Sequence, residues 1–286
     1  MVNEQKNPDP NFPTTKFPNP EELGVMDLAI KYAKNVEADL VIANDPDADR
    51  CAIAVKSSNG NWRNVRGDEV GTALGKYLID SHNLKNKSMA NSLVSSTLLS
   101  KIAKHNQINF FETLTGFKWI SKIPNLAFGY EEALGYCVDP EVVNDKDGIS
   151  AAVLIAQLID ELKNKGRSFD DYLDDIGVEF GFHATDQISV RVDDLAQIDK
   201  LLSKIISDPP YDLAGYKIES VEDLNQSQEL KTTGIRLRYS GEIRVIIRPS
   251  GTEPKLKCYI EVVKSNKSES LELISQIKEV LTKVLS

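Results

Sequence analysis

The sequence is poor in cysteine and has no long apolar run. Its three cysteines, Cys51, Cys137 and Cys258, are an odd number without the spacing of a metal site. They suit a reducing compartment, each as a small buried side chain. No apolar run approaches the length of a membrane span, and the first residues lack the charged-then-apolar pattern of a signal peptide. We therefore expect a cytoplasmic protein that does not bind membranes.

Basic residues are scarce relative to acidic ones. Lys and Arg number 34 against 43 Asp and Glu, so the formal net charge is −9. A protein that binds the backbone of a nucleic acid needs a basic surface, and this balance argues against a nucleic-acid partner. A small phosphorylated ligand requires only a local basic pocket and remains compatible with the composition. The length of 286 residues is sufficient for two or three domains.

The acidic turn Asp45-Pro46-Asp47-Ala48-Asp49-Arg50 follows the apolar run 40–44, which is typical of a buried strand. Its three carboxylates repel one another, and a hard divalent cation such as Mg²⁺ or Ca²⁺ relieves that repulsion by binding their oxygens. Arg50 adds a fork-shaped donor for a carboxylate or a phosphate. Two interpretations remain open from these residues, a cation site and a solvated acidic turn.

Two later segments carry candidate groups for a sugar and for a proton. The strand 126–130 leads into Glu131, where a carboxylate can accept strong hydrogen bonds from vicinal hydroxyl groups. Lys146 stands between two aspartates, before an apolar helix over 149–162. It is either a salt-bridged residue at a helix start or, in a cleft, a lysine whose pKa is brought into acid–base range.

The turn at 248–255 brings hydroxyl groups, a glycine and two cations together. Ser250, Gly251 and Thr252 form the turn, and Arg248 and Lys255 stand at its rim. Hydroxyl, backbone and cationic donors that converge in this way can cradle a phosphate. An ordinary surface loop is the alternative.

Helix start signals are clearest at two places. One helix is expected from Pro20, with Asn19 as its N-cap, and another over 67–79, with Asp68 as its N-cap. Short strands alternate with helices before residue 165, which predicts α/β architecture. The polar segment 165–181 is interpreted as a hinge, and the strands and two helices beyond residue 187 predict an α+β domain.

These motifs resemble those of the alpha-D-phosphohexomutases, the phosphoglucomutase and phosphomannomutase family. Residues 45–50 are similar to the family's metal loop, and Arg248 with Ser250–Pro254 matches its Arg-x-Ser-Gly-Thr-Glu-Pro phosphate-binding motif. The matching segments follow the family's order from about Pro10 to the C-terminus. The resemblance implies two mixed α/β domains, the first partial, and a C-terminal α+β domain. It assigns 1–65 to the end of mutase domain two, 66–181 to domain three and 182–286 to domain four.

The resemblance also implies a role for each candidate residue. Mg²⁺ would bind Asp45, Asp47 and Asp49, while Arg50 would orient the transferring phosphate and Lys146 would act as general acid or base. Glu131 would hold the O3 and O4 hydroxyls of the sugar. Lys118, in the segment 115–118, would face the sugar phosphate. The phosphate that does not react would be anchored by Arg248, Ser250, Gly251, Thr252 and Lys255, and glucose 1,6-bisphosphate would be the activator.

The chain departs from the family pattern in two respects. The family's catalytic loop reads Thr-Ala-Ser-His-Asn-Pro, whereas this sequence offers only Ser81-His82-Asn83, which we interpret as a helix end. The serine-bearing first domain is therefore missing from these residues. Ala133 replaces a serine that many members carry two positions after the sugar-binding glutamate, so the preference between glucose and mannose stays open.

The resemblance therefore predicts the C-terminal portion of an enzyme that interconverts hexose 1-phosphate and hexose 6-phosphate through a phosphoserine and a bisphosphosugar. Without the serine, this portion is expected to be inactive alone. The alternative is a hexose-phosphate-binding module or a partner of a separately encoded first domain. A haloacid-dehalogenase-like phosphatase, with Asp45 or Asp47 as nucleophile, is disfavoured because the loop follows a helix in mid-fold. An EF-hand is excluded because Arg50 and Lys56 stand where its loop needs glycine and glutamate.

Overall fold

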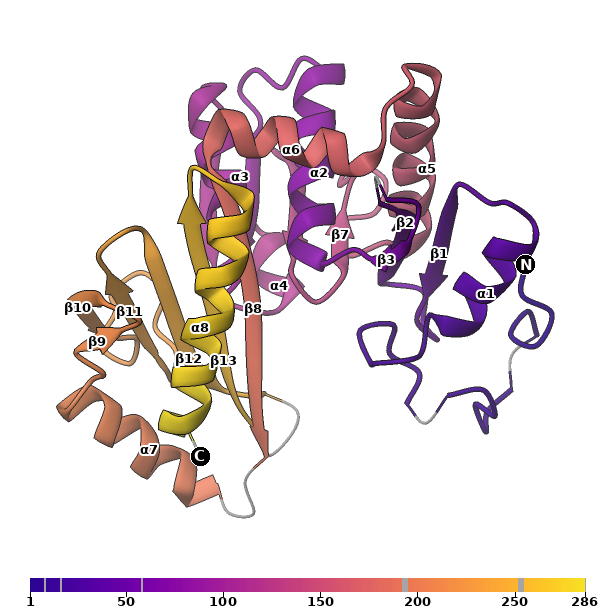
Figure 1. Ribbon diagram of the computed structural model, residues 1–286. Coiled ribbons are helices and arrows are strands. Elements are labelled where there is room, and N and C mark those ends of the chain that lie inside the picture. Colours follow the sequence, from indigo (N-terminus) through magenta and orange to yellow (C-terminus); the bar gives the residue numbers. More distant parts are fainter. Residues whose placement is uncertain (8, 16, 58, 192–194, 252–254, 286) are drawn as a thin grey trace. The chain divides into compact units, whose positions relative to one another are not determined.

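The computed structural model describes residues 1–286 except 8, 16, 58, 192–194, 252–254 and 286 (Figure 1). The chain divides into two compact units, Met1–Asp175 and Ile176–Ser286. Over the described residues, no helix combines the length and the apolar character that crossing a membrane requires. The three cysteines are buried free thiols, and burial raises the pKa of Cys51 and of Cys137 to about 12.

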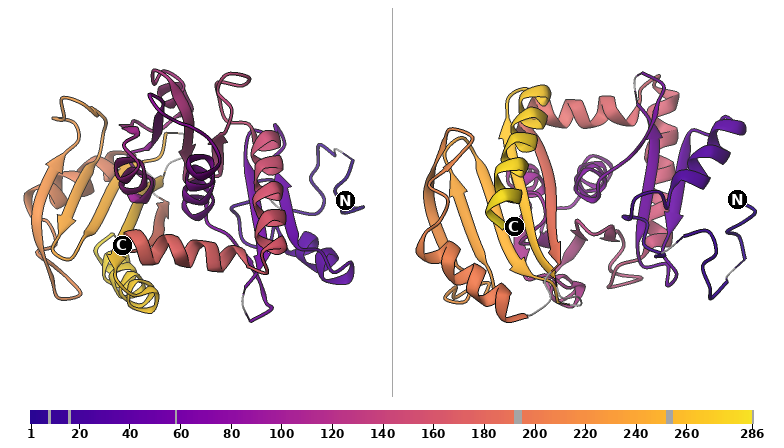
Figure 2. Two further views of the ribbon diagram at one scale, coloured as in Figure 1. Left: turned by 90° about the horizontal axis from the view of Figure 1, so that it is seen from above. Right: turned by 60° about the horizontal axis from the view of Figure 1, so that its bottom comes forward.

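The first unit opens with an antiparallel sheet of order β1-β2-β3, made of Leu40–Asn44, Cys51–Lys56 and Trp62–Asn64. Strands β2 and β3, which follow the acidic turn, form a hairpin. Strand β2 is buried, because α5, Gly148–Asn164, packs against this sheet (Figure 2). Strand β1 is less buried than its apolar run predicted, since Ile42 is 38% exposed.

A second sheet of the same unit has the order β5-β4-β6-β7. Its strands are Ser88–Ser92, Asn109–Thr113, Leu126–Glu131 and Gly135–Cys137, for β4 to β7 in that order. Strand β4 is parallel to β5 and β6, whereas β7 runs antiparallel to β6 and forms a tight hairpin with it. The helices of this unit, apart from α5, are α1 Asp27–Asn35, α2 Gly67–Ser81, α3 Leu98–His105, α4 Phe117–Ile120 and the start of α6 Phe169–Phe180.

Three helix predictions are corrected by the structure. Helix α1 begins at Asp27 and not at Pro20, because the intervening residues form turns and Gly24 has a positive φ of 84°. The N-cap of α2 is Arg66, which places Asp68 in the first turn. The segment 165–181, expected to be a hinge, contains the whole of α6. Ser81 is the last residue of α2, as predicted.

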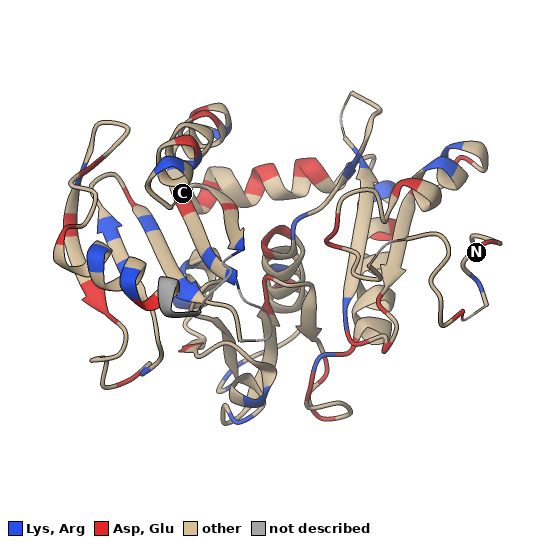
Figure 3. Ribbon diagram, turned by 90° about the horizontal axis from the view of Figure 1, so that it is seen from below, with Lys and Arg blue, Asp and Glu red and all other residues tan. Residues whose placement is uncertain are grey.

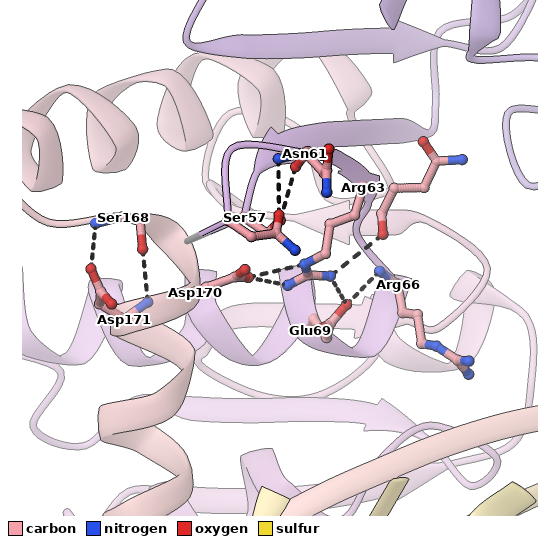
Figure 4. Close-up of polar contacts among 10 residues, drawn as sticks. Ser57, Asn61, Arg63, Arg66, Glu69, Ser168, Asp170 and Asp171 are labelled. Carbon is pink, nitrogen blue, oxygen red and sulfur yellow. Dashed lines mark hydrogen bonds and ion pairs between the residues drawn. The ribbon is translucent and has the colours of Figure 1, made fainter. Parts of the chain in front are cut away.

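Helix α6 starts with a capping box that the polar composition concealed. The N–H of Asp171 donates to Ser168 Oγ at 3.1 Å, and the N–H of Ser168 donates to Asp171 Oδ2 at 2.8 Å (Figure 4). This reciprocal pair satisfies two donors at the helix start. A Ser-x-x-Asp signal was therefore present in the sequence.

Arg63 on β3 connects three elements of the first unit. Its Nε donates to Asp170 of α6 at 3.0 Å, and its Nη1 donates to Glu69 of α2 at 2.9 Å (Figure 4). Burial alone would lower the pKa of Arg63, but the charges and hydrogen bonds of Glu69 and Asp170 outweigh it and raise that pKa. The cluster fixes the start of α6 against the rest of the unit.

Replacing Arg63 by alanine should destabilise the first unit. The change leaves the buried carboxylate of Asp170 without its cation, and charge-assisted hydrogen bonds of this kind are worth about 1.5–3 kcal/mol. Urea unfolding should show a lower free energy of unfolding by about 2–3 kcal/mol. The matched control is Lys163→Ala, which removes an exposed ion pair with Asp39 and should leave the transition unchanged. The same free energy of unfolding for the unchanged chain, Arg63→Ala and Lys163→Ala would contradict the prediction.

The second unit is an antiparallel sheet of order β8-β13-β12-β11-β10-β9. In chain order its strands are β8 Phe182–Arg191, β9 Asp212–Leu213, β10 Tyr216–Asp223, β11 Ile235–Tyr239, β12 Ile243–Pro249 and β13 Lys255–Lys264. Two helices join it, α7 Leu195–Ser207 and α8 Lys267–Leu285, and α8 runs along β8 and β13 (Figures 1 and 2). The α+β prediction is confirmed. On β11 apolar residues alternate with arginines, and β12 and β13 also carry basic residues (Figure 3).

Candidate functional site

The acidic turn lies between β1 and β2, at the carboxyl end of β1 as predicted. Carboxylate oxygens of Asp45, Asp47 and Asp49 lie within 4.8 Å of one another. Ala48 adopts a positive φ of 58°, an uncommon conformation for a residue with a Cβ, and its N–H donates to the carbonyl of Asp45 at 3.0 Å. The backbone therefore folds back on itself and gathers the three acids.

Arg50 closes this turn by binding its first acid. The backbone N–H of Arg50 donates to Asp45 Oδ1 at 3.1 Å, and its Nε donates to Asp45 Oδ2 at 2.6 Å. Burial alone would raise the pKa of Asp45, but the hydrogen bonds and charge of Arg50 outweigh it, so that pKa is lowered. Asp45 is thus held as a carboxylate in a buried position.

The donor set of this turn fits Mg²⁺. That ion takes oxygen ligands at about 2.0–2.1 Å in octahedral geometry, so neighbouring ligand oxygens lie about 3 Å apart. A small contraction of the turn would bring the three acids to that spacing. Asp49 Oδ1 is also buried and accepts no hydrogen bond from the part of the chain that the structure describes, with Arg50 Nε 3.6 Å away. An unbonded buried carboxylate oxygen is a ready cation ligand.

Lys146 lies beside the acidic turn. Its Nζ is 2.6 Å from Asp49 Oδ2. Its aliphatic chain packs on Gly135, where a Cβ would overlap Lys146 Cδ. The sequence suggested a neighbouring aspartate as partner, but the ammonium pairs with Asp49 of the acidic turn 45–50, named here the candidate cation loop. The lysine predicted to act as acid or base and a candidate metal ligand are therefore in direct contact.

Glu131 and Arg50 flank Gly135 on adjacent strands. Glu131 pairs with Gly135 across the β6–β7 hairpin, and Gly135 forms an antiparallel bridge with Arg50. Adjacent strands lie about 4.7–4.9 Å apart, so the backbones of Glu131 and Arg50 are separated by about 10 Å. That distance suits a single sugar phosphate.

Helix α4 is attached to the same hairpin. The N–H of Gly116, its N-cap, donates to Glu131 Oε1 at 2.6 Å, and φ of Gly116 is 106°, which favours glycine. Lys118, on this helix, is exposed, and its Nζ lies 5.6 Å from the centre of the Trp119 ring. Glu131 and the segment that carries Lys118 are therefore joined directly.

Gly148 holds the cation loop against the start of α5. Its N–H donates to the Ala48 carbonyl at 3.0 Å. A Cβ there would overlap the carbonyl oxygen of Arg50 and lie 2.7 Å from that of Ala48. A second backbone contact joins the start of β2 to the turn between β6 and β7, since the N–H of Cys51 donates to the carbonyl of Leu134 at 3.0 Å. Neither junction was predicted, although the Asp-Gly pair at 147–148 offered a signal for the first.

Substituting Gly148 by alanine should loosen the cation loop. Both obstructing atoms are backbone oxygens, so the loop itself must shift, and overpacking typically costs about 1–3 kcal/mol. Mg²⁺ affinity, measured by calorimetry, should fall by about tenfold, the equivalent of about 1.4 kcal/mol. Val153→Ala, at an exposed position of α5, is the control and should bind Mg²⁺ as the unchanged protein does. Unaltered affinity in Gly148→Ala would show that the junction does not shape the loop.

The predicted phosphate turn lies in the second unit, between β12 and β13. The N–H of Ser250 donates to the carbonyl of Lys255 at 2.8 Å, which closes the turn. Arg248 Nε is buried without a hydrogen-bond partner among the residues that the structure describes, and no described atom would obstruct a Cβ at Gly251. Thr252 lies outside the described residues, as do 253 and 254. A buried guanidinium N–H beside an open glycine turn is suited to an oxyanion.

Comparisons with known families match most of the chain. Residues 1–60 match the family model described as phosphoglucomutase/phosphomannomutase, alpha/beta/alpha domain II. Residues 66–178 match alpha/beta/alpha domain III of the same family, and 188–274 match its C-terminal domain. The chain therefore belongs to the phosphoglucomutase/phosphomannomutase family.

Individual relatives agree with this assignment. The chain is 44% identical over its full length to a probable phosphomannomutase of Haemophilus influenzae and covers 59% of that protein. It is 37% identical to the phosphopentomutase of Homo sapiens, a match that includes 97% of this chain and 52% of the relative. The chain thus spans about half to three-fifths of the length of these relatives.

A solved structure shows the same fold. The phosphoglucomutase parafusin of Paramecium, in its open form, superposes with a TM-score of 0.65 at 20% identity. The superposition covers 87% of this chain and 44% of parafusin. The mixed α/β architecture expected from the sequence is confirmed.

Proposed function

We propose that this chain supplies the cation-, sugar- and phosphate-binding parts of a phosphohexomutase. The serine that carries the transferred phosphoryl group would come from polypeptide outside these 286 residues. The complete enzyme would interconvert hexose 1-phosphate and hexose 6-phosphate through a bisphosphosugar. The chain alone would bind ligand without turnover.

The observation that carries this proposal is the alignment of Arg50, Gly135 and Glu131 on adjacent strands. This alignment supports the proposal that the acidic turn, the guanidinium of Arg50, Lys146 and the carboxylate of Glu131 act on one sugar phosphate. A solvated acidic turn, the simpler interpretation, does not account for the buried Asp45 or for the Lys146–Asp49 contact. Groups from separate sequence segments that converge in this way are typical of an active site.

Each group has a physical task in the proposed reaction. Mg²⁺, when bound by Asp45, Asp47 and Asp49, would offset negative charge on the transferring phosphoryl group. Arg50 would orient that group by charge-assisted hydrogen bonds, and Glu131 would accept hydrogen bonds from sugar hydroxyls. Lys146 would hold or release the proton of the reacting hydroxyl.

The turn in the second unit would hold the phosphate that does not react. Arg248 Nε and the donors of Ser250 and Gly251 support this role, and we propose that Thr252 and Lys255 contribute to it. Binding a remote phosphate converts binding energy into positioning of the reacting oxygen.

The range of substrates is part of the proposal. The relatives include a probable phosphomannomutase and a phosphopentomutase, so hexose and pentose phosphates are both candidates. We propose a hexose phosphate with glucose 1,6-bisphosphate as activator. A cytoplasmic location, supported by the three free thiols, completes the proposal.

Complementation tests the proposed function. The chain is mixed with the part of the Haemophilus influenzae relative that lies outside the match, and conversion of glucose 1-phosphate is followed with Mg²⁺ and glucose 1,6-bisphosphate. We expect turnover from the mixture and none from either piece. Turnover by the chain alone would contradict the need for an external serine. Sugar phosphate binding without any turnover in the mixture would favour a binding module.

A further inference from the structure

Glu132, next to the proposed sugar-binding residue, forms a triangle with two serine hydroxyls. Ser92 Oγ and Ser95 Oγ are 2.9 Å apart, and each lies 3.0 Å from Glu132 Oε2. The N–H of Glu132 also donates to Ser95 Oγ at 3.1 Å. Both serines are buried beside the end of β4, so the triangle ties the 131–135 turn to the centre of its sheet.

The number of protons decides how many sides of this triangle are hydrogen bonds. Each hydroxyl carries one proton, so an ionised Glu132 leaves two protons for three short oxygen–oxygen contacts. One side is then a contact between lone pairs. A neutral carboxylic acid contributes a third proton, and a ring of three hydrogen bonds forms. The geometry fits the neutral acid better than the carboxylate.

The charges around Glu132 favour the same form. Burial raises the pKa of Glu132 to about 7, and the negative charges of Glu131 and Asp68 add to the rise. Asp68, in the first turn of α2, accepts hydrogen bonds from the N–H of Ser96 at 2.6 Å and from the hydroxyl of Tyr130 at 3.0 Å. Lys146, whose chain packs on the same turn at Gly135, is paired with Asp49 instead.

We propose that Glu132 is a positioning residue, whose neutral carboxylic acid fixes the 131–135 turn and thereby the carboxylate that holds the sugar. Ionisation opens one side of the ring and places a second negative charge beside Glu131. Sugar-phosphate affinity therefore falls as pH rises above about 7. The inference rests on the proposed function, because it assigns Glu131 to the sugar.

The test compares Glu132→Gln with the unchanged chain across pH. The glutamine amide stays neutral and, with its nitrogen toward the hydroxyls, supplies two protons, so it reproduces the ring at every pH. Binding of glucose 6-phosphate is measured by calorimetry at pH 6 and pH 8. If only molecules with a neutral Glu132 bind the sugar phosphate, about one-tenth of the molecules can bind it at one pH unit above the pKa of Glu132. The dissociation constant of the unchanged chain should then rise about tenfold relative to that of the variant.

Glu141→Gln is the matched control for the loss of an acid, since Glu141 is exposed and paired with Lys87. It should keep the pH dependence of the unchanged chain. Comparison with Glu132→Gln cancels the titration of the sugar's own phosphate. Binding with the same pH dependence in all three proteins would overturn the inference and leave the proposed function intact.

A second readout needs no ligand. Amide hydrogen exchange of 131–135 is measured in the unchanged chain and in Glu132→Gln. The rate in the unchanged chain, divided by the rate in the variant, should increase between pH 6 and pH 8. A ratio that does not change with pH would overturn the inference even if no sugar phosphate bound. Absence of glucose 6-phosphate binding at every pH would instead count against the proposed function.

Discussion

Replacing Asp47 by asparagine should lower the turnover of the complemented enzyme by about 10²–10³-fold, the usual effect of removing one preorganised charge-stabilising group. The substitution keeps the size of the side chain and removes a charge from the cation loop. Asp47 is exposed, so a loss of folding stability does not account for such an effect. The measurement is the initial rate of glucose 1-phosphate conversion at the Mg²⁺ concentration that just saturates the unchanged enzyme.

Asp39→Asn is the control for Asp47→Asn, because Asp39 is an exposed acid that directly precedes β1 and pairs with Lys163. Its rate should equal that of the unchanged enzyme. A similar rate for Asp47→Asn would contradict the cation role of the loop. Recovery of Asp47→Asn at high Mg²⁺ would locate the defect in metal affinity.

Lys146→Met should change two measurements in opposite directions. Removing an ammonium 2.6 Å from Asp49 Oδ2 frees that oxygen for a cation, so Mg²⁺ should bind the isolated chain about tenfold more tightly, or by about 1.4 kcal/mol. The complemented enzyme should lose turnover by about 10²–10⁴-fold, the range of general acid–base catalysis. Calorimetry and initial rates check the two effects separately.

The opposite directions of these effects on Mg²⁺ binding and on turnover distinguish a lysine that carries a proton from a lysine that only stabilises the loop. A lysine that only stabilised the loop would, when lost, weaken both Mg²⁺ binding and turnover. Lys163→Met, which removes an exposed lysine of α5, is the control and should affect neither. Weaker Mg²⁺ binding by Lys146→Met would contradict the proposed competition for Asp49.

The gathering of the three acids in the turn 45–50 could be predicted because these groups are local in sequence. Three acids and an arginine within six residues, after an apolar run, leave few arrangements for the carboxylates. The strand pairings that join Arg50 to Gly135, and the contact between Lys146 and Asp49, could not be predicted in this way. They depend on how distant segments pack, which no local spacing records.

Glu131 and Glu132 show the same limit at neighbouring positions. The sequence presents two equivalent glutamates, and the resemblance selected the first for the sugar. Only the fold distinguishes the two glutamates. Glu131 accepts a hydrogen bond from the N–H of Gly116, whereas Glu132 is hydrogen-bonded to the hydroxyls of Ser92 and Ser95. Helix α6 was missed for another reason, because the capping pair Ser168 and Asp171 was hidden in a polar segment.

The central claim is that the 131–135 turn binds a sugar phosphate and that the turn between β12 and β13 binds a phosphate group, and hydrogen exchange tests it most directly. Exchange of backbone amides is measured with and without glucose 1,6-bisphosphate, in the presence of Mg²⁺. We expect slower exchange in 131–135 and in 248–251 over the same range of ligand concentration. Protection of only one segment, or of each at widely different concentrations, would contradict the account.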